Sequence, residues 1–463
     1  MALKYASKLS IAALLLFRLS SAQVPGTALP NLRPRMLTQK CTRIAGCVTQ
    51  TTSVTLDWNL RPIHDSVGVP CFTRDTGVDR NICPNHYICS QRCYVENVDY
   101  TFSGVTTSGD SVTLRQYSDY DRSDASPRVY LLDTDGNYVL LKLLGGEISF
   151  DVDVAELPCG ENANMFLSEM PANGGKSTLN PGGAEFGGAY CDGRCTYQYW
   201  KGGKLDAAGP SCCNQVHLLE ANRLAVKFTP HVCIPNSNIC DQDGCGFNPY
   251  TAGYHNYWGA GGTVDTLRRI TVLTQFITDD GTANGNLKTI RRKYIQNGQV
   301  IASAAVGGDN IDANNCPSGD PYGGFRTLGD ALRRGMVLGF SLWNDPVDNM
   351  NWLDSGENGP CDPQIGSPEY IFANYPIAKV TFSKVRWGEL DSTTSNTNPI
   401  TTTSSTSRSP LTTKQSSTTS PIPNGPTQTR WGQCGGIGYG GPTQCEAGTA
   451  CYTQNPYWAQ CLS

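Results

Sequence analysis

Residues 127–154, PRVYLLDTDGNYVLLKLLGGEISFDVDV, contain the pattern that decides the fold. Two apolar runs, Arg128 to Leu132 and Tyr138 to Leu144, flank the turn residues Asp135-Gly136-Asn137. After them, apolar and polar residues alternate from Ile148 to Val154. Side chains of a strand alternate between its two faces, so this alternation with a period of two predicts a strand. The short turn predicts an antiparallel hairpin between the two apolar runs.

Further strand-like runs occur along the chain, at Ile270 to Phe276, Met336 to Trp343 and Val380 to Trp387. Only Thr327 to Arg334 has a helical pattern. Many short strands with few helices predict an all-β fold in which antiparallel sheets pack as a β-sandwich. The net charge is −4 and the sequence has no basic stripe, which argues against nucleic acid or an anionic membrane as a partner.

The N-terminus indicates export. Two lysines and then an apolar run, Ile11 to Phe17, precede small residues at positions 20–22. We predict a secretory signal peptide over residues 1–22, cleaved before Gln23, because the apolar run is too short to span a bilayer. The mature protein is therefore expected to be secreted and extracellular.

The cysteines agree with export. Of the twenty, sixteen lie between positions 41 and 361 and four between 434 and 461, so each part can close its own disulfides. A CysXXXCys pair, Cys191 and Cys195, and the adjacent cysteines at 212–213 also fit metal or redox sites. In an exported chain with five histidines, disulfides are the better interpretation. We expect no metal site and no cofactor.

Composition divides the chain into four parts. The signal peptide, residues 1–22, is followed by a strand-rich domain over residues 23–391. Residues 392–427 are mostly Ser and Thr with scattered Pro, a composition that cannot bury a core and predicts an extended tether. We favour an O-glycosylated tether over a bare disordered one. Residues 428–463 form a module so small that it needs its disulfides to be stable.

The C-terminal module is rich in aromatic residues for its size, with Trp431, Tyr439, Tyr457 and Trp458. If the segment is a strand, the neighbours Tyr457 and Trp458 cannot both point into one small core. Rings left outside on a flat face suit the apolar C–H faces of sugar rings. Next to these rings, Asn455 and Gln460 would form hydrogen bonds with the hydroxyl groups of the sugar.

Two strings, QCGGIGYGGPTQC at 433–445 and NPYWAQC at 455–461, resemble the fungal family 1 carbohydrate-binding module over the whole tail. The resemblance implies the disulfides Cys434–Cys451 and Cys445–Cys461. It also implies that cellulose stacks on the rings of Trp431, Tyr457 and Trp458. The alternative is a knottin-like toxin or inhibitor.

The stretch SCCNQVHLLEANR, residues 211–223, is the candidate for chemistry. Glycoside hydrolysis with retention needs two carboxyl groups about 5–5.5 Å apart, which one strand can carry. Positions 215 and 217 share a face of a strand, whereas position 220 falls on the other face unless an extra residue is inserted. We therefore predict a β-bulge between positions 217 and 220.

The large domain is similar to glycoside hydrolase family 7, nearest its endo-β-1,4-glucanases, from Gln23 to Leu390. The strings that carry the similarity include LTQKCTRIAGCVTQTTSVTLDWN at 37–59, GCGFNPY at 244–250 and NMNWLDSGENGPC at 349–361. The resemblance implies a jelly-roll sandwich of two curved antiparallel sheets with an open substrate cleft. It also implies that the partner is cellulose or a related β-1,4-glucan, and we expect a monomer.

The family's catalytic pattern, Glu-X-Asp-X-X-Glu, falls on Gln215, His217 and Glu220. The resemblance implies that position 215 is the nucleophile, position 217 the helper aspartate and Glu220 the acid/base. An amide at position 215 is uncharged and far less nucleophilic than a carboxylate. Without that neighbouring carboxylate, Glu220 also loses a like-charge effect that helps raise its pKa.

Other cleft positions divide into changed and retained ones. The family's tyrosine near the nucleophile is Phe166 here, its aromatic platforms fall on Leu60 and Pro62, and a glutamine falls on Arg194. The retained positions, for each of which the alternative role is fold maintenance, are Arg128, Asp192, His231, Asn344, Asp345 and Trp352. Among these, Trp352 is the one that would stack on a glucosyl ring.

Three hypotheses follow. We favour a non-catalytic glucan-binding derivative, because several cleft residues have changed together. The second is an active endo-β-1,4-glucanase that cleaves internal bonds of cellulose with retention. The third is an inverting mechanism with His217 as base and Glu220 as acid, which requires a wider separation of about 6.5–9.5 Å.

Overall fold

The structure is a computed structural model of the 463-residue chain. It describes residues 25–26, 32–73, 76–201, 204–235, 237–305, 308–316, 321–394, 427–430, 432–435, 439, 441–455 and 458–462. The predicted signal peptide and most of the predicted tether lie outside the described residues. The chain forms two compact units, Met1–Thr401 and Thr402–Ser463.

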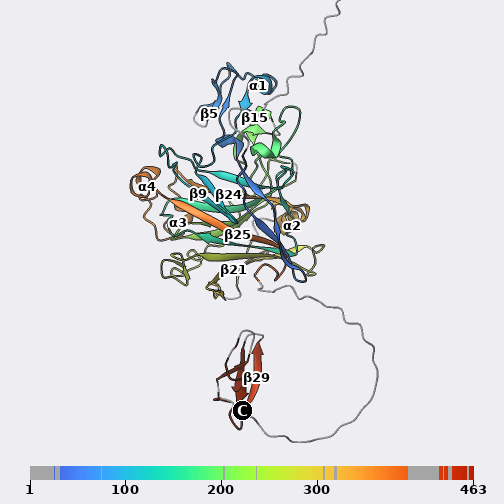
Figure 1. Cartoon of the computed structure of the whole chain (residues 1–463), viewed down its shortest axis with the longest axis vertical. Helices are drawn as coiled ribbons and strands as arrows, with labels where there is room; N and C mark the ends of the chain where they lie inside the picture. Colours follow the sequence, from blue (N-terminus) through green and yellow to red (C-terminus); the bar gives the residue numbers. More distant parts are fainter. Residues whose placement is uncertain are drawn as a thin grey trace, which may run out of the picture. The chain divides into compact units, whose positions relative to one another are not determined.

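Two antiparallel sheets make up the body of the first unit (Figure 1). The ten-stranded sheet consists of β1 (Thr38–Thr42), β2 (Gly46–Gln50), β8 (Val105–Ser108), β9 (Ser111–Arg115), β12 (Gly146–Asp153), β20 (Ile270–Thr278), β21 (Leu287–Gln296), β22 (Gln299–Val300), β23 (Asp309–Asp312) and β25 (Lys379–Glu389). Its one parallel contact joins β1 to β25. The seven-stranded sheet consists of β3 (Ser53–Leu56), β10 (Arg128–Leu132), β11 (Leu140–Leu141), β13 (Glu161–Ser168), β16 (Gln215–Ala221), β17 (Val226–His231) and β24 (Met336–Asn344).

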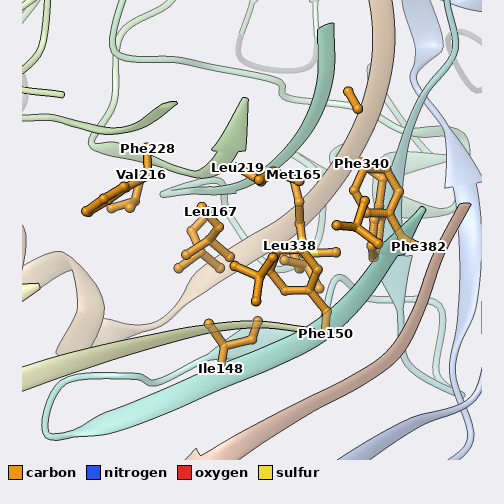
Figure 2. Packing of buried hydrophobic residues seen from close by; sticks show 14 of the residues in the cluster. Ile148, Phe150, Met165, Leu167, Val216, Leu219, Phe228, Leu338, Phe340 and Phe382 are labelled. Atoms are coloured by element: carbon orange, nitrogen blue, oxygen red, sulfur yellow. The ribbon is translucent and has the colours of Figure 1, made fainter. Parts of the chain in front are cut away.

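The hydrophobic core lies between these two sheets. Figure 2 shows Phe150 and Phe382 of the ten-stranded sheet beside Phe340 of the seven-stranded sheet. The ring centroids of Phe340 and Phe382 are 5.5 Å apart. The alternating residues Ile148, Phe150 and Val152 all point into this core and are fully buried. The predicted all-β sandwich is therefore confirmed, and its core is built by the predicted alternation.

The predicted hairpin is wrong in its pairing. The strands β10 and β11 both pair with β24, and the two runs meet only in a single bridge between Leu132 and Tyr138. The tight turn itself is present, but Tyr138 donates its N–H to the Ala172 carbonyl and its hydroxyl to the Gly188 carbonyl. Beyond that bridge the second run leaves the first, because Leu140 and Leu141 pair with β24, a distant strand that no local sequence signal reports.

The predicted helix lies within α2 (Gly324–Arg334), but it is not the only one. The other α-helices of the described residues are α1 (His86–Arg92), α3 (Asn351–Asp354) and α4 (Pro368–Asn374). Side-chain caps explain two of them, because Asn85 accepts hydrogen bonds at the start of α1 and Ser367 does so at the start of α4. In the described part of the chain, no helix is both long and apolar enough to cross a membrane.

A small lobe with its own core lies at one end of the sandwich, where Figure 1 labels β5, α1 and β15. This end lobe contains α1, the short strands β4 (Ile63–His64), β5 (Pro70–Thr73), β6 (Gly77–Val78) and β7 (Tyr94–Val95), and the hairpin of β14 (Tyr197–Lys201) and β15 (Lys204–Pro210). Its core packs Trp58 against Trp200, with ring centroids 4.6 Å apart. The disulfides Cys71–Cys93 and Cys83–Cys89 staple it.

All twenty cysteines form disulfides, as expected. Two of these bonds, Cys191–Cys213 and Cys195–Cys212, join the CysXXXCys segment to the adjacent pair. The segment is thereby fastened to the residues that immediately precede β16. The metal alternative for these four cysteines is wrong.

The second unit carries β26 (Thr427–Gln428), β27 (Gln433–Gly435), β28 (Gln444–Cys445), β29 (Ala450–Asn455) and β30 (Trp458–Leu462). Its disulfides are Cys434–Cys451 and Cys445–Cys461, the pairing that the resemblance implied. Gln460 lies on β30 opposite Tyr452. Trp431 and Tyr457 lie outside the described residues, and Asn455 and Trp458 are described only as backbone of β29 and β30.

The core contact between the sheets yields a stability prediction. Replacing Phe340 by Ala removes a fully buried ring from the sandwich core, so we expect a loss of roughly 3–5 kcal/mol in the free energy of unfolding. Urea denaturation of the purified chain measures the loss. The control is Val347→Ala, at a residue that is 92% exposed. Equal unfolding midpoints for the two variants would contradict the assigned core.

Candidate active site

The strand β16 carries the candidate catalytic positions and is bulged as predicted. Its pairing with β17 shifts between His217 and Glu220. Along β13, Leu219 pairs with Met165 and His217 with Phe166, which leaves Leu218 as the extra residue. The bulge brings His217 and Glu220 to one face, with His217 Nδ1 and Glu220 Oε1 3.7 Å apart. Leu218 and Leu219 remain in the hydrophobic core.

A cavity of about 510 Å³ opens on the outer face of the seven-stranded sheet. Its floor comes from β10, β13, β16 and β24, and one wall comes from the end lobe. It brings together four of the predicted site residues, Gln215, His217, Arg128 and Asp192. It also contains the changed positions Leu60, Phe166 and Arg194. The other lining residues include Asn59, Phe72, Asn164, Tyr190, Tyr197, Gln198, Tyr199, Ser341 and Trp343.

Gln215 is buried and held in place by the backbone. Its Oε1 accepts a hydrogen bond from the N–H of Gly193 at 3.1 Å. Gly193 lies between Cys191 and Cys195 in the segment fastened by two disulfides. No other residue fits there, because a Cβ on Gly193 would lie 2.1 Å from Cβ of His231. A backbone N–H in this position would serve a carboxylate as well as an amide.

His217 is a neutral histidine. Its Nδ1 lies 2.9 Å from Nδ2 of Asn164, and its ring packs perpendicular to that of His231, with centroids 5.2 Å apart. Burial lowers the pKa of His217 to about 3. His231 is also held neutral, because burial lowers its pKa to about 4. His217 therefore forms no ion pair with Glu220 near neutral pH.

Glu220 is buried, and its pKa is raised because burial disfavours the charged carboxylate. The positive charge of Lys227 opposes this effect without cancelling it. Thr229 Oγ1 donates a hydrogen bond to Glu220 Oε2 at 3.1 Å. From the sequence alone, we expected only that Glu220 has lost a neighbouring carboxylate that would help to raise its pKa. The structure shows that burial raises the pKa without such a neighbour, which favours the protonated form that a general acid needs.

The remaining predicted cleft residues differ in position. Arg128 lines the cavity, with its guanidinium 3.1 Å from Oδ2 of Asp57 and 3.7 Å above the ring of Tyr190. Asp192 lines it too and accepts a hydrogen bond from the N–H of Thr196. His231 lies outside the lining residues and bonds through Nδ1 to the Asp241 carbonyl.

Trp352 is not among the residues that line this cavity. It stacks on Trp343, with ring centroids 6.2 Å apart, and Trp343 is the one that reaches the lining. Sequence reasoning missed Trp343, because it was counted only as the end of a strand-like run. Its place at the end of a strand of the cleft floor, next to Asn344 and Asp345, was the available signal.

Nothing in the described residues supports a metal centre. Each group of side chains with suitable spacing includes cysteines that are already bonded in disulfides. The pair His217 and His231 belongs to none of these groups.

The cavity on this sheet is lined by aromatic rings together with polar side chains, which suits a ligand that has apolar faces and polar edges. A family model described as glycosyl hydrolase family 7 matches residues 25–394, and one described as fungal cellulose binding domain matches residues 430–461. The chain therefore belongs to glycosyl hydrolase family 7 and carries a fungal cellulose-binding domain.

Individual relatives agree. The chain is 51% identical to endoglucanase EG-1 of Hypocrea jecorina over 458 residues, which is 98% of both chains. It is 44% identical to a probable endo-beta-1,4-glucanase celB of Aspergillus clavatus over 83% of this chain and 97% of the relative. The native endocellulase EGI of Humicola insolens superposes with a TM-score of 0.75 at 37% identity, covering 80% of this chain and all of that one.

The burial of His217 predicts a pH dependence of stability. Its pKa is about 3 in the folded chain and about 6.5 when unfolded, so unfolding takes up a proton between these values. The stabilisation is full above pH 6.5 and is lost as the pH falls toward 3. The slope of the unfolding free energy against pH is proportional to the number of protons that unfolding takes up. We expect His217→Gln to reduce that number by about one.

Urea denaturation at several pH values between 7 and 4 measures the slope. The matched control is His255→Gln, because His255 is exposed. An unchanged slope in the His217 variant would show that the pKa of His217 is the same in the folded and unfolded chain and is not lowered by burial.

Proposed function

We propose that this protein is a secreted, cellulose-targeted glucan-binding protein of the endo-β-1,4-glucanase type whose hydrolytic activity is severely impaired. The observation that carries the proposal is the amide of Gln215 at the position where the family has its nucleophile. That amide is buried, hydrogen-bonded to Gly193 and directed at the cavity. Membership of the family supports the substrate class, which is a β-1,4-glucan.

The chemistry explains why one substitution matters so much. In a retaining glycosidase, a carboxylate attacks the sugar while the acid/base protonates the departing oxygen. Glu220 is suited to the second task, because burial raises the pKa of its carboxyl and so favours the protonated form. General acid catalysis alone contributes about 10²–10⁴-fold, whereas enzymes typically need about 10⁶-fold or more. Without an anion at position 215, general acid catalysis by Glu220 cannot supply most of the rate acceleration of a typical enzyme.

The inverting alternative is disfavoured by geometry and by basicity. His217 Nδ1 and Glu220 Oε1 are 3.7 Å apart, while an inverting pair needs about 6.5–9.5 Å to hold a water between its members. A histidine with a pKa of about 3 is also a weak base. The active retaining endoglucanase is the second candidate, and the names of the relatives favour it.

The C-terminal module supplies the targeting half of the proposal. The match to a fungal cellulose-binding domain supports adhesion to cellulose through Trp431, Tyr457 and Trp458, with Asn455 and Gln460 beside them. A tether over residues 392–427 would hold the cleft at high local concentration near the same surface. Export through a signal peptide at residues 1–22 completes the proposal.

Hydrolysis is the first test. We expect the pure chain to release no more product from carboxymethyl cellulose or a chromogenic cellobioside than its own Glu220→Gln variant. The double variant Gln215→Glu with His217→Asp restores both lost carboxylates and should gain hydrolysis that Glu220→Gln abolishes. Normal turnover by the unchanged chain would refute the impairment, and an inert double variant would show that the cleft has lost more than its nucleophile, which contradicts position 215 as the sole cause.

Adhesion is the second test. Replacing Trp431, Tyr457 and Trp458 together by Ala should release most of the chain from crystalline cellulose in a sedimentation assay, as should deletion of residues 428–463. The control is Tyr439→Phe, which keeps its ring and removes only a hydrogen bond to Gln428 within the module. Unchanged adhesion of the triple variant would eliminate the docking role of these rings.

A further inference from the structure

Three aromatic rings of the end lobe form a row beside the catalytic positions. Tyr197 and Tyr199 of β14 both line the 510 Å³ cavity, and their ring centroids are 5.4 Å apart. Phe72 of β5 lines the same cavity and lies 5.4 Å from Tyr199. Tyr197 is at the open end of the row, and it is 56% exposed.

The row is held on a rigid support. The ring of Tyr199 lies over Gly77, where an added Cβ would come within 2.9 Å of its Cε1 atom. Trp200 directly follows Tyr199 in β14 and is buried against Trp58 in the core of the end lobe. At the base of the hairpin, the disulfide Cys195–Cys212 fastens β14 to the segment before β16. A ring held in this way loses little conformational entropy when a ligand stacks on it.

Polar groups surround the row. Arg194 and Asp192 line the cavity beside Tyr197, and Gln198 accepts a hydrogen bond from Asn59 at 2.9 Å. A flat ring with hydrogen-bonding groups at its edge suits a sugar that is apolar on its faces and polar around its rim. A β-1,4-linked glucose chain has this chemistry, because its hydroxyl groups are equatorial and its axial C–H bonds cover the faces.

We propose that Tyr197, supported by Tyr199 and Phe72, is a stacking subsite for a β-1,4-glucan chain in this cleft. The inference rests on the proposed glucan-binding function and assigns residues to it. Leu60, which lines the same cavity, offers no ring for stacking. The rings of the end lobe can therefore stack on a sugar in this cavity, which the side chain of Leu60 cannot do.

The test measures binding of cellohexaose by titration calorimetry. Every variant is the full chain with Trp431, Tyr457 and Trp458 replaced by Ala, so that the signal reports the cleft and not the module. We expect Tyr197→Ala to weaken binding about tenfold, since a lost aromatic contact has roughly that effect on an equilibrium constant. Tyr197→Phe keeps the ring and should bind within about twofold of the parent.

The matched control is Tyr87→Ala. Tyr87 lies on α1 of the same lobe and is 61% exposed, but it does not line the cavity, so its loss should leave binding unchanged. Equal affinity of Tyr197→Ala and the parent would overturn the subsite and leave glucan binding intact. A parent that binds no cellohexaose would overturn both the subsite and the proposed glucan binding.

Discussion

The hydrogen bond from the Gly193 N–H to Oε1 of Gln215 holds an uncharged amide at the position that the proposed function assigns to the nucleophile. Two disulfides fix the segment that carries Gly193, and the bulge at Leu218 fixes the strand that carries Gln215. The segment and the strand that meet at this hydrogen bond are therefore both held in place. The amide of Gln215 is uncharged, whereas a retaining mechanism needs a carboxylate as its nucleophile.

Burial has opposite consequences for the two ionisable neighbours of that amide. It raises the pKa of Glu220 and lowers that of His217, so both side chains favour their neutral forms. A neutral His217 suits contact with an uncharged polysaccharide, while Arg128, Asp192 and Arg194 supply charged groups elsewhere in the lining of the cavity. The raised pKa of Glu220 and the amide at position 215 both reduce the negative charge on β16 that could stabilise a positively charged sugar centre.

The sequence predicted the parts of the fold that depend on local periodicity. The alternation at Ile148, Phe150 and Val152 correctly placed a core strand, and the spacing of positions 215, 217 and 220 correctly required a bulge. The hairpin prediction was wrong because both runs pair with β24, which is distant in the sequence. The short helices were missed although Asn85 and Ser367 are recognisable caps. Tyr197 gave no signal at all, because only the folded end lobe brings its ring to the cleft.

The central claim is that no side chain at position 215 captures the sugar. Incubation with a 2-deoxy-2-fluoro-cellobioside that bears a good leaving group, followed by mass spectrometry of the peptides, tests it directly. The account predicts no glycosyl adduct on the peptide that contains Gln215, while the variant with Gln215→Glu and His217→Asp acquires one at position 215. A covalent adduct on Gln215 of the unchanged chain would contradict the account.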